Sequence, residues 1–139
     1  MAIKVLRGTF GRVWVDGELF THVKSFEAKA NLKYEDIDVN NEMGTQHLYM
    51  GYDVAGTLVT HKTDTRLVSK IRNGILTGKM PEIKFVGMLS DPAVNGAERV
   101  EIIDVTFDEA TLIAFETKKA MEESTPFKAA KFNYLEEIL

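Results

Sequence analysis

Apolar and polar residues alternate along most of this chain, and a period of two is the feature that most constrains its fold. An Asp-Gly pair at Asp16-Gly17, flanked by apolar residues, predicts a two-residue hairpin turn because both central positions need positive φ. The return strand is expected over residues 19–30, with Phe26 and Ala28 on one face and Ser25 and Glu27 on the other. Only the first of these faces has the character of a core face.

Further strands are predicted over residues 51–60, 83–89, 99–107, 111–117 and 127–134, the last preceded by Pro126 at a position suited to a strand start. The strands 83–89 and 99–107 are expected to pair across a turn-rich loop. Residues 31–47 lack sustained periodicity and are predicted to form a long loop.

One segment has helical spacing, through Leu67, Val68, Ile71 and Ile75. Thr63-Asp64 supplies an N-cap and Gly78 a C′ residue, so a helix is predicted from Asp64 to about Thr77. Gly74 costs about 1 kcal/mol relative to Ala inside a helix, so an end near Asn73 is the alternative. The fold predicted is mainly β, a sandwich or barrel of about seven strands with one flanking α-helix, in a single domain spanning residues 1–139.

Composition excludes several functional classes for this chain of 139 residues. The absence of Cys removes disulfides, thiolate nucleophiles and Cys-ligated metals, and a net charge of −4 disfavours tight nucleic-acid binding. No apolar run has the length of a membrane span or a signal peptide, so no membrane insertion is expected.

Sequence motifs for phosphate, calcium or other metal binding are present only in incomplete form. Gly74 to Lys79 lacks the spacing and the hydroxyl residue of a phosphate loop, and residues 36–47 place Asn41 and His47 where a calcium loop needs Gly and Glu. The three histidines, His22, His47 and His61, have no ligand spacing. We therefore predict no enzyme, no catalytic residue, no metal site and no cofactor.

Apolar side chains fall in or next to the predicted loop, which is unusual for a solvated segment. Aromatic residues and Met are enriched at protein interfaces. The residues concerned include Tyr34, Ile37, Val39, Met43, Tyr49 and Met50. This surplus of apolar surface favours assembly with a partner.

The order of these features resembles the tail tube proteins of contractile phage tails, especially those of Gram-positive phages, defective prophages and R-type bacteriocins. The resemblance covers nearly the whole chain. Its most specific parts are the hairpin around Asp16-Gly17-Glu18, Phe26-Glu27-Ala28, Glu98-Arg99-Val100, Asp104-Val105-Thr106-Phe107 and Glu122-Glu123-Ser124-Thr125-Pro126-Phe127.

This resemblance implies a structural protein that forms hexameric rings, stacked into a tube inside a contractile sheath. Neighbouring subunits in that family join their strands into one barrel, and the lumen is a conduit for DNA or ions. The implied partners are other copies of the chain, the sheath protein, and tape-measure and baseplate proteins, with DNA as transient cargo. The implied location is a virion tail or phage-tail-like particle assembled in the host cytoplasm.

The resemblance also assigns roles to residues. The loop after the first hairpin reaches the next ring in that family, and here that role falls on residues 31–50, through Tyr34, Ile37, Val39, Met43, Tyr49 and Met50. The candidate lumen residues are Ser25, Glu27, Lys29, Asp53 and Thr57. The candidate sheath-facing residues are Lys70, Arg72 and Lys79.

Two other functions remain open. One is the related hexameric tube of a cell-to-cell secretion machine, whose lumen carries effector proteins. The other is a monomeric β-barrel of lipocalin type that binds a small ligand in an apolar cavity. Concentration-dependent assembly separates either tube from the monomeric barrel.

Overall fold

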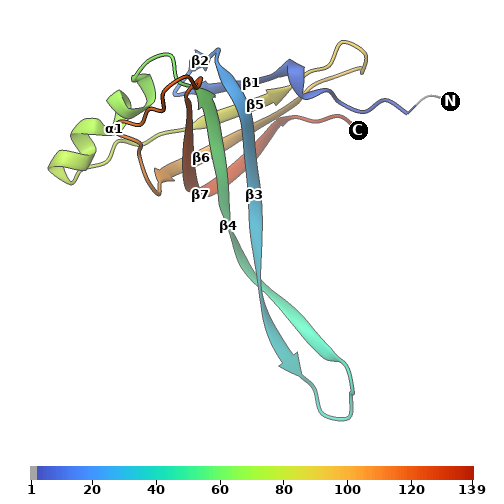
Figure 1. The fold of residues 1–139 in the computed structure, drawn as a ribbon. Helices are drawn as coiled ribbons and strands as arrows, with labels where there is room; N and C mark the ends of the chain where they lie inside the picture. The colour runs from blue at the N-terminus through green and yellow to red at the C-terminus, as the bar shows by residue number, and fades with distance from the viewer. Residues whose placement is uncertain (1–2) are drawn as a thin grey trace.

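The computed structural model describes residues 3–139 and contains one antiparallel sheet of seven strands in the order β2-β1-β5-β6-β7-β4-β3 (Figure 1). The strands are β1 (Gly11–Val15), β2 (Glu18–Phe20), β3 (Val23–Asp38), β4 (Thr45–His61), β5 (Phe85–Leu89), β6 (Glu98–Phe107) and β7 (Glu122–Glu136). A 3-10 turn (Gly8–Phe10) precedes them, and α1 (Arg66–Thr77) is the one α-helix within residues 3–139. The predicted mainly β fold with a flanking helix is confirmed.

The Asp16-Gly17 turn forms as predicted, with φ of 51° and 82° at its two residues. The single return strand predicted over residues 19–30 is wrong, because the chain breaks between β2 and β3. β2 pairs only with β1, and β3 pairs only with β4. The break therefore sends the two strands to opposite edges of the sheet.

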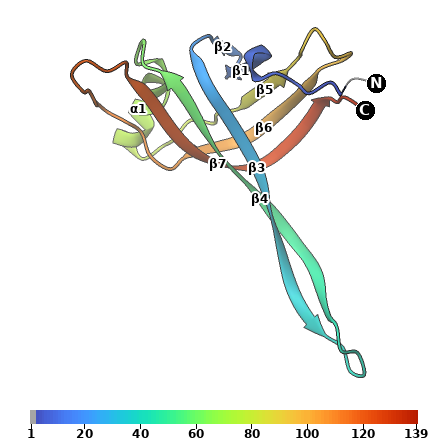
Figure 2. The same ribbon diagram turned by 45° about the vertical axis from the view of Figure 1, so that its right-hand side comes forward.

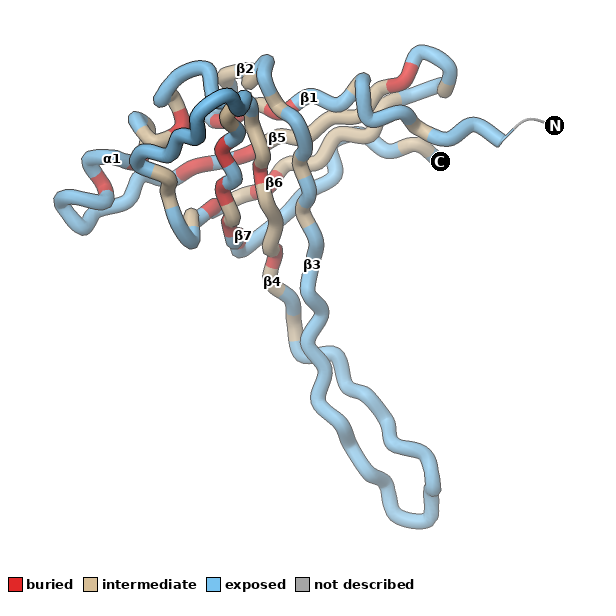
Figure 3. The backbone as a smooth tube through the Cα atoms, viewed as in Figure 1, coloured by how far each residue is buried: buried red, intermediate tan, exposed pale blue. Residues whose placement is uncertain are grey.

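Aromatic packing on the concave side shows how far the sheet curls. Phe26 on the edge strand β3 stacks on Phe127 of β7 at 5.8 Å between ring centroids and meets Phe85 of β5 edge-on at 6.0 Å. Phe85 and Phe127 are fully buried and meet at 4.9 Å. The core thus lies inside the curl, and its buried residues gather in the body of the molecule (Figure 3).

The helix closes one end of this core with Leu67 and Ile71. It begins at Arg66, whose amide donates to Asp64 Oδ1 at 3.1 Å, and it ends at Thr77, with Gly78 as its C-cap at φ of 82°. The end at Gly78 is confirmed over the alternative at Asn73. A Cβ on Gly74 would lie 2.7 Å from the sulfur of Met80, so close packing explains a glycine inside the helix.

The long loop predicted over residues 31–47 is wrong. Residues 31–38 continue β3 and residues 45–47 begin β4, and their backbones pair from Asn31↔Asp53 to Asp38↔Thr45. Only residues 39–44 connect the two strands. Periodicity failed here because it detects strands with one buried face, whereas every residue from 31 to 50 is exposed.

Two further strand predictions need correction at β7 and before it. Residues 111–117 form no strand, and the chain runs from β6 to β7 through them as an irregular segment. β7 begins at Glu122, so Pro126 lies inside the strand and does not start it. Its carbonyl accepts from the Asp108 amide just beyond the last β6–β7 pair, so its missing N–H falls where the ladder has ended.

A buried carboxylate fixes the N-terminal segment to the β5–β6 loop. Asp91 is 1% exposed and accepts from Arg7 Nε and Nη2 at 2.8 Å each, from the Arg7 amide at 3.1 Å and from the Ala93 amide at 2.9 Å. The hydrogen bonds from Arg7 hold the pKa of Asp91 well below its usual range.

Replacement of Asp91 by Asn is therefore expected to lower the melting temperature by about 5 °C at pH 7. A lowered folded-state pKa stabilises the fold above the unfolded value of about 4, and this contribution is lost as pH falls below it. The gap between Asp91→Asn and the unmodified chain should therefore shrink below about pH 4. Thermal melts between pH 7 and pH 3 test this, and a gap that stays constant would contradict it.

Candidate functional site

The most distinctive surface is a two-stranded arm, defined here as residues 31–50. Both views show it projecting far from the curled sheet (Figures 1 and 2). β4 pairs with β7 only from Val54 to His61, so within the arm each strand has only its hairpin partner. A register shift between Lys33 and Tyr34, next to Gly51 with φ of 141°, marks the point where the arm leaves the body.

Short polar contacts support the arm in place of a core. Asp36 pairs with His47 Nδ1 at 2.5 Å, Asp38 accepts from Thr45 Oγ1 at 2.9 Å, and Glu42 accepts from Gln46 at 3.1 Å. These pairs join residues that face each other across the hairpin or its tip. The arm is therefore a formed element that buries none of its side chains in this chain.

The six residues predicted to contact the next ring all lie on the arm, and all are exposed. Tyr34 and Tyr49 face each other across the strands, with ring centroids 5.7 Å apart in an edge-to-face geometry. The other four are Ile37 in β3, Val39 and Met43 in the tip, and Met50 beside the register shift. The structure thus gathers them on one projecting element. Leu32 shares a face with Tyr34, whereas Leu48 lies across from Glu35 on the opposite face with Ile37, so both faces of the arm expose apolar side chains.

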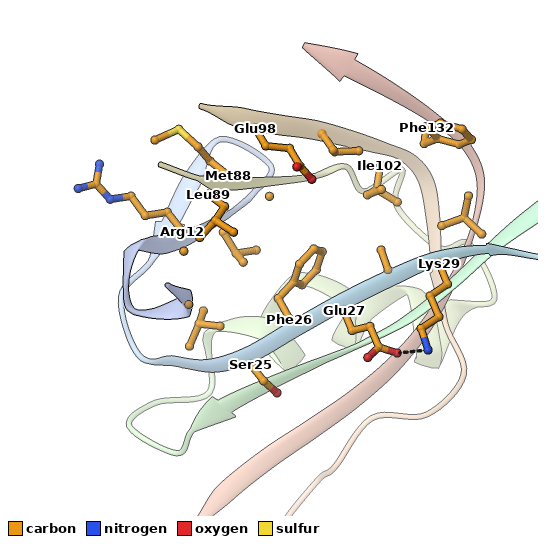
Figure 4. Close-up of a pocket in the computed structure, with 18 of the residues that line it drawn as sticks. Arg12, Ser25, Phe26, Glu27, Lys29, Met88, Leu89, Glu98, Ile102 and Phe132 are labelled. Atoms are coloured by element: carbon orange, nitrogen blue, oxygen red, sulfur yellow. Dashed lines mark ion pairs between the residues drawn. The ribbon is translucent and has the colours of Figure 1, made fainter. Parts of the chain in front are cut away.

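The outer edge of β3 is a second distinctive surface, because its backbone groups lack a strand partner. This strand of 16 residues lies at the end of the sheet and has no partner on its outer side. Beside it opens a cavity of about 750 Å³, lined on the concave face by Phe26, Ala28, Val54, Val100 and Ile102. Figure 4 shows Phe26 pointing into this cavity, with Ser25, Glu27 and Lys29 directed away from it.

The five candidate lumen residues share one face of β3 and β4, opposite the core. Glu27 lies directly across from Thr57, and Asp53 lies across from Asn31. Glu27 and Lys29 form an ion pair at 3.3 Å, so this part of the face carries balanced charge (Figure 4). The alternation predicted for Ser25, Glu27 and Lys29 is present, and the structure brings Asp53 and Thr57 beside them.

The three candidate sheath-facing residues are not brought together. Lys70 is directed toward the body, where its Nζ lies 2.9 Å from Glu18. Arg66 also contacts Glu18 at 2.8 Å, and the two cations hold the pKa of that carboxyl below its usual range. Arg72 and Lys79 are exposed.

Sequence reasoning missed an apolar surface between β6 and β7. Leu112, Ile113 and Phe115 are 78%, 82% and 82% exposed, although the pattern placed them in a strand. These residues were visible in the sequence as an apolar run. The sequence does not reveal that the sheet leaves no free edge where this run could pair as a strand.

Within residues 3–139 no group of three or more His, Asp or Glu side chains is arranged to hold a metal ion. None of the helices in that part of the chain has the length and apolar character needed to cross a membrane.

A curated relative matches over nearly the full length. The phage-like element PBSX protein XkdM of Bacillus subtilis (strain 168) is 29% identical over 143 residues, covering 99% of this chain and 97% of the relative. A second Bacillus subtilis protein, YqbM, matches with the same identity and coverage.

Solved structures share the fold. The tube-terminating cap of an anti-feeding prophage superposes with a TM-score of 0.79 at 10% identity, covering 99% of this chain and 95% of that one. A chain from the sheath–tube complex of an extracellular contractile injection system gives 0.66 at 15% identity, covering 99% and 93%. A sequence profile described as Phage tail tube protein (DUF2001) matches residues 1–136. The predicted resemblance is confirmed, and this chain belongs to the phage tail tube protein family.

Proposed function

We propose that this chain is a structural subunit, acting as one domain over residues 1–139, that assembles into stacked hexameric rings. These rings form the inner tube of a contractile phage tail or phage-tail-like particle, a conduit for DNA or ions. The observation that carries the proposal is the unpartnered outer edge of β3 beside an apolar cavity, together with an arm that exposes apolar side chains.

The edge of β3 is the proposed contact within a ring. A long unpaired edge invites pairing with another chain, and monomeric proteins usually protect such edges. A neighbouring copy seated against β3 would satisfy this backbone and cover the cavity lined by Phe26 and Ile102. β2 lies at the other edge of the sheet, so pairing of β3 with a neighbour's β2 would be a head-to-tail contact, and such contacts form a ring when the rotation between copies closes.

The arm is the proposed contact between rings, through Tyr34, Tyr49 and the other apolar residues described above. The face with Ser25, Glu27, Lys29, Asp53 and Thr57 is the proposed lumen lining. Its single cation, Lys29, is paired with Glu27, and Asp53 leaves the five residues with a net charge of −1, so a passing polyanion meets few free cations to bind.

The remaining partners follow from this role. We propose that sheath subunits contact the outside of the tube near α1, through Arg72 and Lys79, with Lys70 contributing only if its contact with Glu18 opens. Tape-measure and baseplate proteins would contact the tube inside and at its end. The subunit would be assembled in the host cytoplasm and reside in the tail, with no catalysis and no cofactor.

Electron microscopy of the purified chain across a concentration series tests this function. Tubes or six-fold rings with a central channel are the expected result as concentration rises. A secretion-machine tube would have the same appearance and would differ in its cargo. A monomer at every concentration that binds a small apolar ligand in the 750 Å³ cavity would instead indicate the ligand-binding barrel.

One substitution tests whether ring formation depends on the β3 edge. Ala30→Lys places a charge beside the cavity at an exposed position, and an inward charge on an edge strand blocks edge pairing. We expect loss of rings with no loss of thermal stability. Asn95→Lys, at an exposed position in the loop between β5 and β6 and outside both the β3 edge and the arm, is the matched control and should still assemble. Equal assembly by both variants would contradict an edge contact at β3.

A further inference from the structure

The exposed segment between β6 and β7, residues 111–117, is called here the docking strip. Its apolar side chains are not packed in the core, and its backbone is not paired with a strand. Its side chains Leu112, Ile113 and Phe115 are about four-fifths exposed. No backbone hydrogen bond joins the strip to the rest of residues 3–139. A short run of apolar residues with a free backbone has the features of a strand that lacks a partner.

The strip is held in position by both of its ends. Before it, the Asp108 amide donates to the Pro126 carbonyl at 3.1 Å, and Ala110 packs against the core. After it, the Lys62 amide donates to the Met121 carbonyl at 2.9 Å. The apolar side chains are therefore presented at a defined place on the surface.

The strip and the arm lie at opposite ends of the same strand. β4 begins at Thr45 in the arm and ends at His61, which pairs with Glu122 directly after the loop that contains the strip. Figures 1 and 2 both show the arm leaving one end of the body and the β6–β7 connection lying beside α1 at the other. Copies stacked along β4 would bring the arm of one to the strip of the next.

Charge favours the same arrangement. The arm carries Lys33 against the four carboxylates Glu35, Asp36, Asp38 and Glu42, a net charge of −3 with His neutral. Charges around the strip are mixed: Asp108 and Glu109 precede it, and Glu116 within it pairs with Lys119 at 3.3 Å. Lys118 follows the strip directly, and residues 66–79 carry four basic and no acidic residues. Arg72 and Lys79 are assigned above to the sheath contact, so the cation left for the acidic arm is Lys118, which forms no ion pair with another side chain within residues 3–139.

We propose that the docking strip is the receptor for the arm of a second copy in the adjacent ring. The apolar side chains of the strip pack along the arm from Tyr34 and Tyr49 to Met43 at its tip, and the strip backbone pairs with a free edge of the arm. This inference rests on the proposed stacking of rings and names the surface on which the arm lands. The contact is heterologous, so it gives the tube a direction of growth.

Single-cysteine cross-linking tests the contact, because the chain contains no cysteine of its own. Protein with Met43→Cys in the arm tip is mixed with protein carrying Phe115→Cys or Thr117→Cys in the strip, under tube-forming conditions and with a short bismaleimide. A dimer-sized product at least tenfold above that of either protein alone is expected. Leu139→Cys, fully exposed at the C-terminus, replaces the strip cysteine in the matched control and should give no such increase.

The outcomes separate this inference from the proposed function. If the unmodified chain forms tubes but neither strip position links to Met43→Cys, or Leu139→Cys links equally well, the strip is not the receptor and tube formation stands. If the unmodified chain never assembles, the proposed function fails and the contact between rings fails with it.

Discussion

Replacing Tyr34 and Tyr49 together by serine is expected to prevent tube assembly while the body of the chain stays folded. Both side chains are about half exposed, at 55% and 50%, and they contact each other rather than the core. Their loss therefore removes few of the contacts that stabilise the curled sheet. It removes the two aromatic side chains that are best placed to enter a neighbour.

The expected size of this effect follows from interface energetics. Aromatic anchors at interfaces are worth about 2 kcal/mol or more each. Loss of two removes about 4 kcal/mol and raises the concentration needed for assembly by about 1,000-fold. Sedimentation and electron microscopy across a concentration series measure this directly, and the thermal melt of the monomer should shift by less than about 3 °C.

The same arm offers a matched control. Lys33 and Glu35 lie on its other face, and their replacement by serine changes the arm's length and pairing no more than the tyrosine variant does. We expect the control to assemble within a few-fold of the unmodified concentration. Assembly of the double tyrosine variant at the unmodified concentration would exclude this face of the arm as a contact.

Substitution of Gly56 is expected to have the largest effect on folding. A Cβ at this position in β4 would lie 2.0 Å from the Glu27 carbonyl oxygen and 2.9 Å from the Ala28 Cα, both backbone atoms of β3. It would also lie 2.7 Å from Phe127 Cζ, in the centre of the core. The pairing of β3 with β4 and the aromatic cluster cannot both be retained with a larger residue there.

Gly56→Ala is therefore expected to cost at least about 4 kcal/mol of unfolding free energy, most of the stability of an ordinary domain. Urea unfolding followed by fluorescence of Trp14 measures the loss. Gly44→Ala is the matched control, because no atom lies within 4 Å of its added Cβ, and it should change stability by less than about 0.5 kcal/mol. Equal midpoints for the two variants would show that β4 can move away from β3 at Gly56.

Much of the sheet is readable from the sequence because its strands have one buried face. The residues Val13 and Val15 in β1, and Phe127 and Ala129 in β7, alternate in sequence and are buried in the structure. The Asp16-Gly17 turn and the Gly78 helix end were also predictable, since both depend on local backbone geometry.

The arm was the part of the candidate site that alternation misassigned. Its residues were recognised as apolar and displaced from the core, so the set from Tyr34 to Met50 was identified correctly as exposed. Their secondary structure was missed because pairing in the arm depends on backbone hydrogen bonds between two exposed strands. A pattern of side-chain burial carries no information about such pairing.

By itself the sequence determined the mainly β class, the first hairpin, the helix and the surplus of apolar surface, because each depends on residues close in the chain. Only the tertiary structure decided where that surplus lies. Residues 111–117 have the composition of a strand but none of its hydrogen bonds, since β6 and β7 pair with each other and leave no place between them. Strand formation needs a partner edge, and which edges stay open is fixed by the whole sheet.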